Sequence, residues 1–255
     1  MRILVITVAG MSTRFSESIG QTSVKCLYYE NDIKEALLYQ LLHRYNAFDR
    51  YVIVGGWRFE ELRQVLDREY GDLIDKIVLV NNELYEKYGS GYSLYLGLEA
   101  AIKLCPDEIV FAEGDLYVDQ DSFREIADSA KPVVTVNSDP INARKSVVFY
   151  YDTQERLHYL YDTGHNLLEI REPFTEIHNS GQIWKFVCDE DFRNAFDSMR
   201  AGDWQGTNLV FVQNYFSKMS RDDYKVIRFT RWINCNTIAD FRNMQKEIAA
   251  DENLG

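Results

Sequence analysis

Strand-like and helix-like segments alternate along the first 112 residues, and this order limits the folds open to the chain more than any other feature. Short apolar runs rich in β-branched residues predict buried strands, and longer segments with a helical spacing of apolar residues predict amphipathic helices. The predicted strands are 2–8, 51–54, 76–80 and 108–112, and the predicted helices are 33–45, 58–69 and 93–104. Because each helix connects two strands, we expect a parallel sheet with helices on both faces.

The pattern changes after Ala130, where short strands become frequent. The predicted strands of this part are 132–136, 146–151, 156–161, 167–170, 182–187 and 225–228, and its predicted helices are 189–200, 207–218 and 238–250. No internal repeat, low-complexity run or linker separates the two parts. We therefore predict a single domain over 1–255, with a first half at 1–130, a second half at 131–235 and a closing helix at 236–250.

Composition narrows the class of protein. A chain of 255 residues can bury a sizeable core, and its net charge of −12 argues against a general nucleic-acid surface, which needs a basic footprint. The four cysteines form no Cys-x-x-Cys pair, no secretory leader precedes the first strand, and no apolar stretch approaches membrane-spanning length. These features predict a protein of the reducing cytoplasm.

The loop after the first strand concentrates cations in this acidic chain. It opens with Ala9 and Gly10, carries Arg14, and is followed by Lys25. Exposed backbone N–H groups and two cations suit a polyphosphate, because they can share its negative charge. The loop therefore predicts a nucleoside triphosphate site, and the alternative is an ordinary strand–loop–helix start.

This loop resembles the signature of nucleotidyltransferases that make activated sugars and alcohols, in which Ala-Gly-x-Gly-Ser/Thr-Arg is followed by Pro-Lys. Ser12 stands where that family usually has its second glycine, and Val24 stands where it usually has proline. The resemblance implies a Rossmann-like α/β fold with a mostly parallel mixed sheet and a small β-rich insertion over the active site. It also implies that Lys25 and Arg14 carry the catalysis. The phosphate-binding loop would comprise Ala9, Gly10, Met11, Ser12, Thr13 and Arg14.

A carboxylate follows the predicted strand 108–112, where open α/β sheets bind their ligands. By resemblance Asp115 holds Mg²⁺, for which a carboxylate is a suitable ligand. We align Asn236 with the second metal ligand of the family. The alternatives are that Asp115 only starts a turn, and that Asn236 or Thr237 caps the last helix.

The remaining site residues are also implied by resemblance. Choline-phosphate-type cytidylyltransferases carry a similar Asn…Tyr…Ser-Leu arrangement after the third strand, which favours CTP as the donor. The residues expected to bind the nucleotide outside the phosphate loop are Asn81, Gly89, Gly91, Ser93 and Glu113, with Ser93 alternatively capping a helix. The residues expected to bind the acceptor are Arg144, Lys145, Ser180, Gly181 and Trp184.

The function implied is a cytoplasmic, Mg²⁺-dependent transferase that moves CMP from CTP to a small phosphorylated alcohol, amine or amino-acid derivative. Synthesis of precursors for surface polysaccharides is a fitting context, and a homodimer is left open. The alternatives are a sugar-1-phosphate nucleotidyltransferase that uses UTP or dTTP, and a non-catalytic nucleotide-binding module. A glycosyltransferase is disfavoured because the metal strand lacks Asp-x-Asp, and a dehydrogenase because Gly-x-Gly-x-x-Gly does not follow the first strand.

Overall fold

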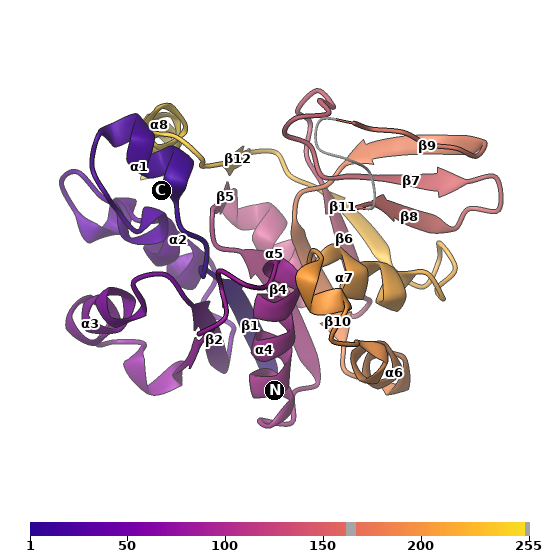
Figure 1. The fold of residues 1–255 in the computed structure, drawn as a ribbon, viewed down its shortest axis with the longest axis horizontal. Coiled ribbons are helices and arrows are strands. Elements are labelled where there is room, and N and C mark those ends of the chain that lie inside the picture. The colour runs from indigo at the N-terminus through magenta and orange to yellow at the C-terminus, as the bar shows by residue number, and fades with distance from the viewer. Residues whose placement is uncertain (162–166, 253–255) are drawn as a thin grey trace.

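A seven-stranded mixed sheet forms the centre of the computed structural model, which describes residues 1–161 and 167–252 (Figure 1). Its strand order is β11-β6-β10-β4-β1-β2-β3, and β10 alone runs antiparallel to its neighbours. The carboxyl ends of the other six strands therefore lie along one edge of the sheet. The strands of this sheet are β1 (Arg2–Thr7), β2 (Arg50–Gly55), β3 (Ile77–Asn81), β4 (Glu108–Glu113), β6 (Val133–Val136), β10 (Ile183–Val187) and β11 (Lys225–Arg228). The mostly parallel mixed sheet expected from the sequence is confirmed.

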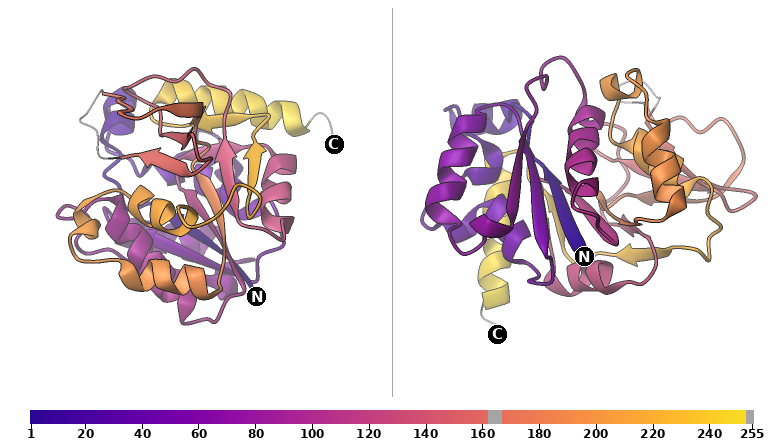
Figure 2. Two further views of the ribbon diagram at one scale, coloured as in Figure 1. Left: turned by 90° about the vertical axis from the view of Figure 1, so that its right-hand side faces the viewer. Right: turned by 90° about the horizontal axis from the view of Figure 1, so that it is seen from below.

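Helices cover both faces of this sheet (Figure 2). One apolar core lies between the sheet and α1, α2, α3, α5 and α8, and the other lies between the sheet and α4, α6 and α7. Such two-sided burial explains why the central strands are continuous apolar runs rather than alternating ones. The helices are α1 (Thr13–Ile19), α2 (Leu37–His43), α3 (Phe59–Glu69), α4 (Ser90–Ile102), α5 (Gln120–Asp128), α6 (Glu190–Ser198), α7 (Leu209–Phe216) and α8 (Ile238–Glu252). Among the described residues, no helix is long and apolar enough to cross a membrane.

Two smaller sheets lie beyond the carboxyl edge of the central sheet (Figure 1). The first is a three-stranded antiparallel sheet in the order β8-β7-β9, which the chain enters after β6 and leaves just before β10. It is the β-rich insertion expected from the sequence. The second pairs β5 with β12 and brings the segment before α8 next to the end of β4. The strands of these sheets are β5 (Leu116–Val118), β7 (Val148–Asp152), β8 (Leu157–Leu160), β9 (Phe174–Asn179) and β12 (Trp232–Asn234).

Most predicted elements are present, with a few corrections. The strand predicted at 167–170 is wrong: this apolar segment pairs with no described strand, and Leu167 is half exposed. The strand lies instead at β9, whose largely exposed residues give no apolar alternation. The helix predicted at 33–45 begins at Leu37, after a single 3₁₀ turn. The sequence did not reveal α1, α5, β5 and β12.

Candidate active site

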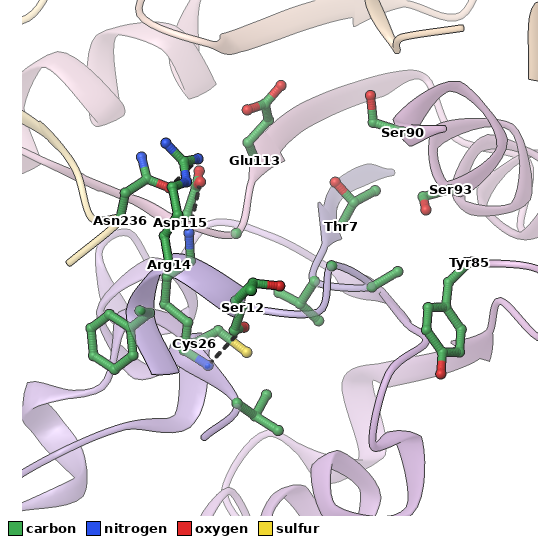
Figure 3. A pocket seen from close by; sticks show the side chains of 18 of the residues that line it. Thr7, Ser12, Arg14, Cys26, Tyr85, Ser90, Ser93, Glu113, Asp115 and Asn236 are labelled. Carbon is green, nitrogen blue, oxygen red and sulfur yellow. Dashed lines mark hydrogen bonds and ion pairs between the residues drawn. The ribbon is translucent and has the colours of Figure 1, made fainter. Parts of the chain in front are cut away.

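A pocket of about 450 Å³ opens at the carboxyl ends of β1 and β4 (Figure 3). Its walls come from the loop after β1, from the segment around Lys25, from the loop that leads into α4, and from the turn after β4. Asn208 and Asn236 complete it from the second half of the chain. Of the residues predicted to form the site, those lining this pocket are Ala9, Gly10, Ser12, Thr13, Arg14, Lys25, Gly89, Ser93, Glu113, Asp115 and Asn236.

Two cations meet two oxygen ligands on one side of this pocket. The Nζ atom of Lys25 lies 3.0 Å from Oδ2 of Asp115 and donates to Oδ1 of Asn236 at 3.2 Å. Arg14 donates to the same Asn236 oxygen at 2.9 Å. The fold thus joins residues up to 222 positions apart in one cluster. All of the members were predicted as site residues.

The β5–β12 ladder is what brings Asn236 to Asp115. The backbone N–H of Cys235 donates to the carbonyl of Asp115 at 2.8 Å, which extends this ladder by one step. That contact sets the segment after β12 against the turn after β4. The side chains of Asn236 and Asp115 therefore face the same pocket.

Thr237 and Asp240 form the cap of α8. The Asp240 carboxylate accepts hydrogen bonds from the backbone N–H groups of Asn236 and Thr237 and from the Thr237 hydroxyl. That hydroxyl in turn accepts a hydrogen bond from the N–H of Asp240 at 3.4 Å, which is the reciprocal pattern of a capping box. Thr237 therefore caps the helix, which is one of the readings left open by the sequence, and the side chain of Asn236 takes no part in that cap.

The donor set on this side of the pocket fits Mg²⁺. Oδ1 of Asp115 is buried and has no hydrogen-bond partner among the described residues, so it is an oxygen in need of a ligand. No group of three or more His, Cys, Asp or Glu side chains in 1–161 or 167–252 is arranged to hold a metal. A metal here would therefore take Asp115, the amide oxygen of Asn236 and oxygens of its substrates, which is a common arrangement for Mg²⁺.

Glu113 and Asn208 form a second polar pair in the pocket (Figure 3 labels Glu113). Asn208 donates from Nδ2 to Oε1 of Glu113 at 2.7 Å. Burial, together with the charge of Asp115, raises the pKa of Glu113 to about 7, and the hydrogen bond from Asn208 opposes this rise. Asn208 was not predicted, because an asparagine before an apolar helix gives no signal beyond an ordinary turn.

The loop between β3 and α4 contributes only some of its predicted residues. Gly89 and Ser93 line the pocket beside Tyr85, whereas the exposed Asn81 and the buried Gly91 do not. A Cβ atom on Gly91 would lie 2.8 Å from the carbonyl oxygen of Asp203, so this glycine allows close packing between α4 and a neighbouring loop.

Ser93 does not cap α4, which begins three residues earlier. Its hydroxyl instead accepts a hydrogen bond at 3.0 Å from the buried side chain of Asn82. Asn82, next to the predicted Asn81, is therefore the asparagine that organises this loop. Successive side chains of a strand point to opposite faces, so Asn81 and Asn82 lie on opposite sides of the chain. This alternation could have identified Asn82 from the sequence.

The predicted acceptor residues do not line the pocket. Arg144 and Lys145 are exposed in a turn before β7. Ser180 and Gly181 lie in the buried connection between β9 and β10.

Trp184 is fully buried in the core. It stacks on Phe111, with ring centroids 5.4 Å apart, and its indole N–H donates to the Tyr159 hydroxyl at 2.7 Å. The structure gives Trp184 a packing role, because a side chain in this position has no surface to offer an acceptor. Met11, from the predicted phosphate loop, is half exposed and also lies outside the pocket lining.

The model of one protein family, described as a domain of unknown function (DUF6564), matches residues 21–248. The chain belongs to this family. No curated protein matches the sequence.

Solved structures of three enzymes resemble the fold along almost its whole length. The inositol-1-phosphate CTP transferase from T. maritima has a TM-score of 0.66 at 15% identity, with 96% of each chain covered. A putative glucose-1-phosphate thymidylyltransferase from Bacillus anthracis has a TM-score of 0.69 at 12% identity, covering 96% of this chain and 94% of that one. The CTP:phosphocholine cytidylyltransferase from Streptococcus pneumoniae has a TM-score of 0.66 at 14% identity, covering 97% of this chain and 100% of that one. The Rossmann-like fold of nucleotidyltransferases, implied by the sequence, is thereby confirmed.

Proposed function

We propose that this protein is a Mg²⁺-dependent nucleotidyltransferase that transfers CMP from CTP to a small phosphorylated acceptor and releases pyrophosphate. The observation that carries the proposal is the meeting of Arg14, Lys25, Asp115 and Asn236 at one side of the pocket. The fold is that of enzymes with this chemistry, and two of the three solved structures above are named for CTP. The acceptor proposed is a phosphorylated alcohol, amine or amino-acid derivative.

The reaction needs no covalent enzyme intermediate. An oxygen of the acceptor's phosphate forms a bond to the α-phosphorus of the nucleotide, and the bond from that phosphorus to the bridging oxygen of pyrophosphate breaks. Both reactants are anions, so the task of the protein is to orient them and to offset their charge.

Each residue of the cluster has a role in this proposal. Arg14 binds the β- and γ-phosphates, for which a guanidinium is well shaped. Lys25 stabilises the charge that develops around the α-phosphorus. Asp115 and Asn236 hold Mg²⁺, which supplies further positive charge to the phosphates when it is bound.

The backbone at Gly10 supports a phosphate cradle. A Cβ atom added at this glycine would meet no atom within 4 Å, so the space beside the loop is open to a ligand. The nucleoside part would lie toward Gly89, Ser93 and Tyr85, and the acceptor toward Glu113, which lies between these residues and the cation cluster in Figure 3. Arg144, Lys145, Ser180, Gly181 and Trp184 are not part of this proposal, because they lie outside the pocket.

A pyrophosphate-release screen tests the function. Four nucleoside triphosphates are assayed against a panel of small phosphates and phosphonates, each with and without Mg²⁺. Release that requires Mg²⁺, CTP and one acceptor supports the proposal. Release with UTP or dTTP and a sugar 1-phosphate would favour the second candidate, which the likeness to a thymidylyltransferase supports. No release from any pair, with nucleotide binding retained in calorimetry, would favour a non-catalytic module.

A cytoplasmic location is part of the same proposal. All four cysteines are free in the structure, as expected in a reducing compartment. A homodimer and a place in the synthesis of surface polysaccharide precursors stay predictions.

A further inference from the structure

Two serines one helical turn apart tie α1 to the segment that carries Lys25. The hydroxyl of Ser12 accepts a hydrogen bond from the backbone N–H of Lys25 at 3.2 Å, marked beside Ser12 in Figure 3. The hydroxyl of Ser16 accepts from the N–H of Ser23 at 3.2 Å and donates to its carbonyl at 3.3 Å. The returning segment is thus held at two points by side chains from the start of α1.

Ser12 occupies a backbone conformation that favours glycine. Its φ of 54° and ψ of 28° place it in the left-handed region, where a Cβ atom is strained. Glycine is also what the resembling nucleotidyltransferases usually have at this position. A hydrogen bond to the Ser12 hydroxyl can offset this backbone strain. Among the described residues, the only hydrogen bond to this hydroxyl comes from the backbone N–H of Lys25.

Val24, immediately before Lys25, is the second departure from that pattern. Its φ of −77° is within the range of proline, and no described residue accepts a hydrogen bond from its N–H. A proline would therefore fit here and would stiffen the backbone next to Lys25. With valine in its place, the segment needs another restraint.

We propose that Ser12 is a positioning residue for Lys25, and that its hydroxyl supplies the restraint that proline would otherwise give. The proposal rests on the proposed function, because it assigns Lys25 to the phosphates of a bound nucleotide. The backbone of the loop faces the ligand, and the Ser12 hydroxyl faces the Lys25 amide. The Lys25 ammonium then stays opposite Asp115 and Asn236 when no nucleotide is bound.

The test compares Ser12→Gly with the double variant Ser12→Gly/Val24→Pro. Glycine removes the hydroxyl and relieves the backbone strain, so the fold should survive. We expect Ser12→Gly to weaken the binding of Mg²⁺·CTP about tenfold by calorimetry, since one hydrogen bond is worth about that factor. We also expect faster amide hydrogen exchange in peptides that contain Lys25. The double variant should regain most of the affinity for Mg²⁺·CTP and most of the protection from exchange at Lys25.

Ser129→Ala is the matched control, because the Ser129 hydroxyl also accepts from a lysine N–H, that of Lys131, at 3.2 Å. It lies outside the pocket lining and should leave nucleotide affinity unchanged. Unchanged exchange at Lys25 in Ser12→Gly would overturn the proposal. Lost affinity that Val24→Pro does not recover would overturn it too, because the hydroxyl would then act by touching the ligand. A wild-type protein that binds no nucleoside triphosphate would refute the proposed function instead, while the exchange experiment would still report on the restraint.

Discussion

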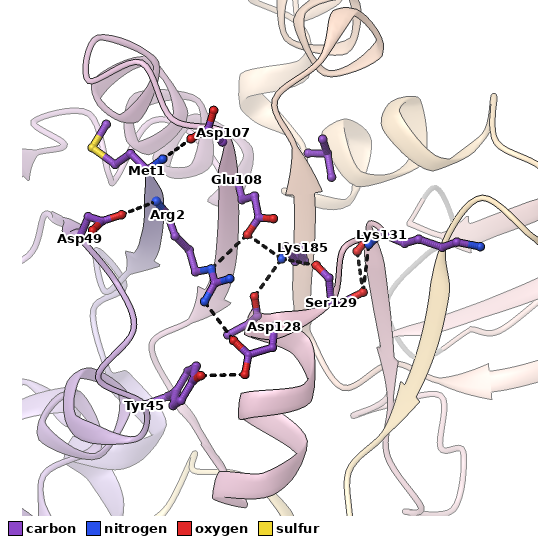
Figure 4. A network of polar contacts seen from close by, with 12 residues as sticks. Met1, Arg2, Tyr45, Asp49, Asp107, Glu108, Asp128, Ser129, Lys131 and Lys185 are labelled. Carbon is purple, nitrogen blue, oxygen red and sulfur yellow. Dashed lines mark hydrogen bonds and ion pairs between the residues drawn. The ribbon is translucent and has the colours of Figure 1, made fainter.

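Replacing Lys185 by methionine tests how much a buried ammonium group in the central sheet stabilises the fold. Lys185 lies on β10, and its side chain is fully buried. Its ammonium donates to the carbonyl of Ala127 at 2.8 Å and to that of Ser129, at the end of α5, and lies 2.7 Å from Glu108 (Figure 4). Burial lowers the pKa of Lys185, and the hydrogen bond and charge of Glu108 oppose this fall. Methionine fills a similar volume without supplying any of these donors.

The expected cost follows from the groups that lose a partner. Glu108 keeps a hydrogen bond from Nε of Arg2 at 3.0 Å, so it is not left alone. The two carbonyl oxygens lose the ammonium, at about 1–2 kcal/mol each. We therefore expect Lys185→Met to lower the free energy of unfolding by about 3 kcal/mol, at the lower end of the range for breaking a buried ion pair. For a chain of this size the loss corresponds to a fall in Tm of about 6–12 °C.

Urea unfolding followed by circular dichroism measures this loss, with thermal unfolding as a second readout. Lys103→Met is the matched control, because Lys103 pairs with Glu99 one turn away on the exposed face of α4. The control should change stability by less than about 0.5 kcal/mol. If Lys185→Met were as stable as the control, the argument that the buried ammonium holds the end of α5 would be refuted.

Three further predictions concern the site, the thiols and the acid limit of stability. Lys25→Met should lower kcat for pyrophosphate release by a factor on the order of 10²–10³, with Lys103→Met as control, and a normal kcat would remove Lys25 from the mechanism. Burial raises the pKa values of the Cys26, Cys188 and Cys235 thiols to about 12, whereas Cys105 is exposed. N-ethylmaleimide at pH 8 should therefore modify Cys105 rapidly in the native protein and all four thiols in denaturant. Rapid labelling of Cys26 in the native protein would contradict its buried position. Burial of Asp152 disfavours its charge, but hydrogen bonds from the backbone and guanidinium of Arg156 and from His158 outweigh it, so its pKa is well below the ordinary 3.8. The ionised Asp152 therefore stabilises the fold above pH about 3.8, and this stabilisation is lost as the pH falls further. The difference in unfolding free energy between wild type and Asp152→Asn should shrink on acidification. A difference that stays constant with pH would refute this role of Asp152.

Local patterns were enough to predict the parallel part of the fold. The strands at the centre of the sheet are buried on both faces, so their sequences are continuous apolar runs that need no tertiary information to recognise. The exposed β9 was missed for the opposite reason, since neither of its faces is buried enough to impose alternation. Trp184 was assigned to an acceptor site because a motif contains it, but β10 is covered on both faces, so its side chain lies in the core.

The sequence by itself determined which residues carry the charge of the site: Arg14, Lys25 and Asp115 each follow a recognisable strand or loop, and their chemistry depends on residue type alone. Only the tertiary structure decided their grouping with Asn236 and the addition of Asn208. The ladder of β5 with β12 and the entry of α7 beside β4 are contacts between distant parts of the chain. Such contacts depend on which surfaces pack together. A local pattern of residue types predicts a helix or a strand, but not the distant segment against which it packs. The same holds for the Ser12 hydroxyl. It accepts a hydrogen bond from the backbone N–H of Lys25, thirteen residues away, which only the folded loop brings close to it.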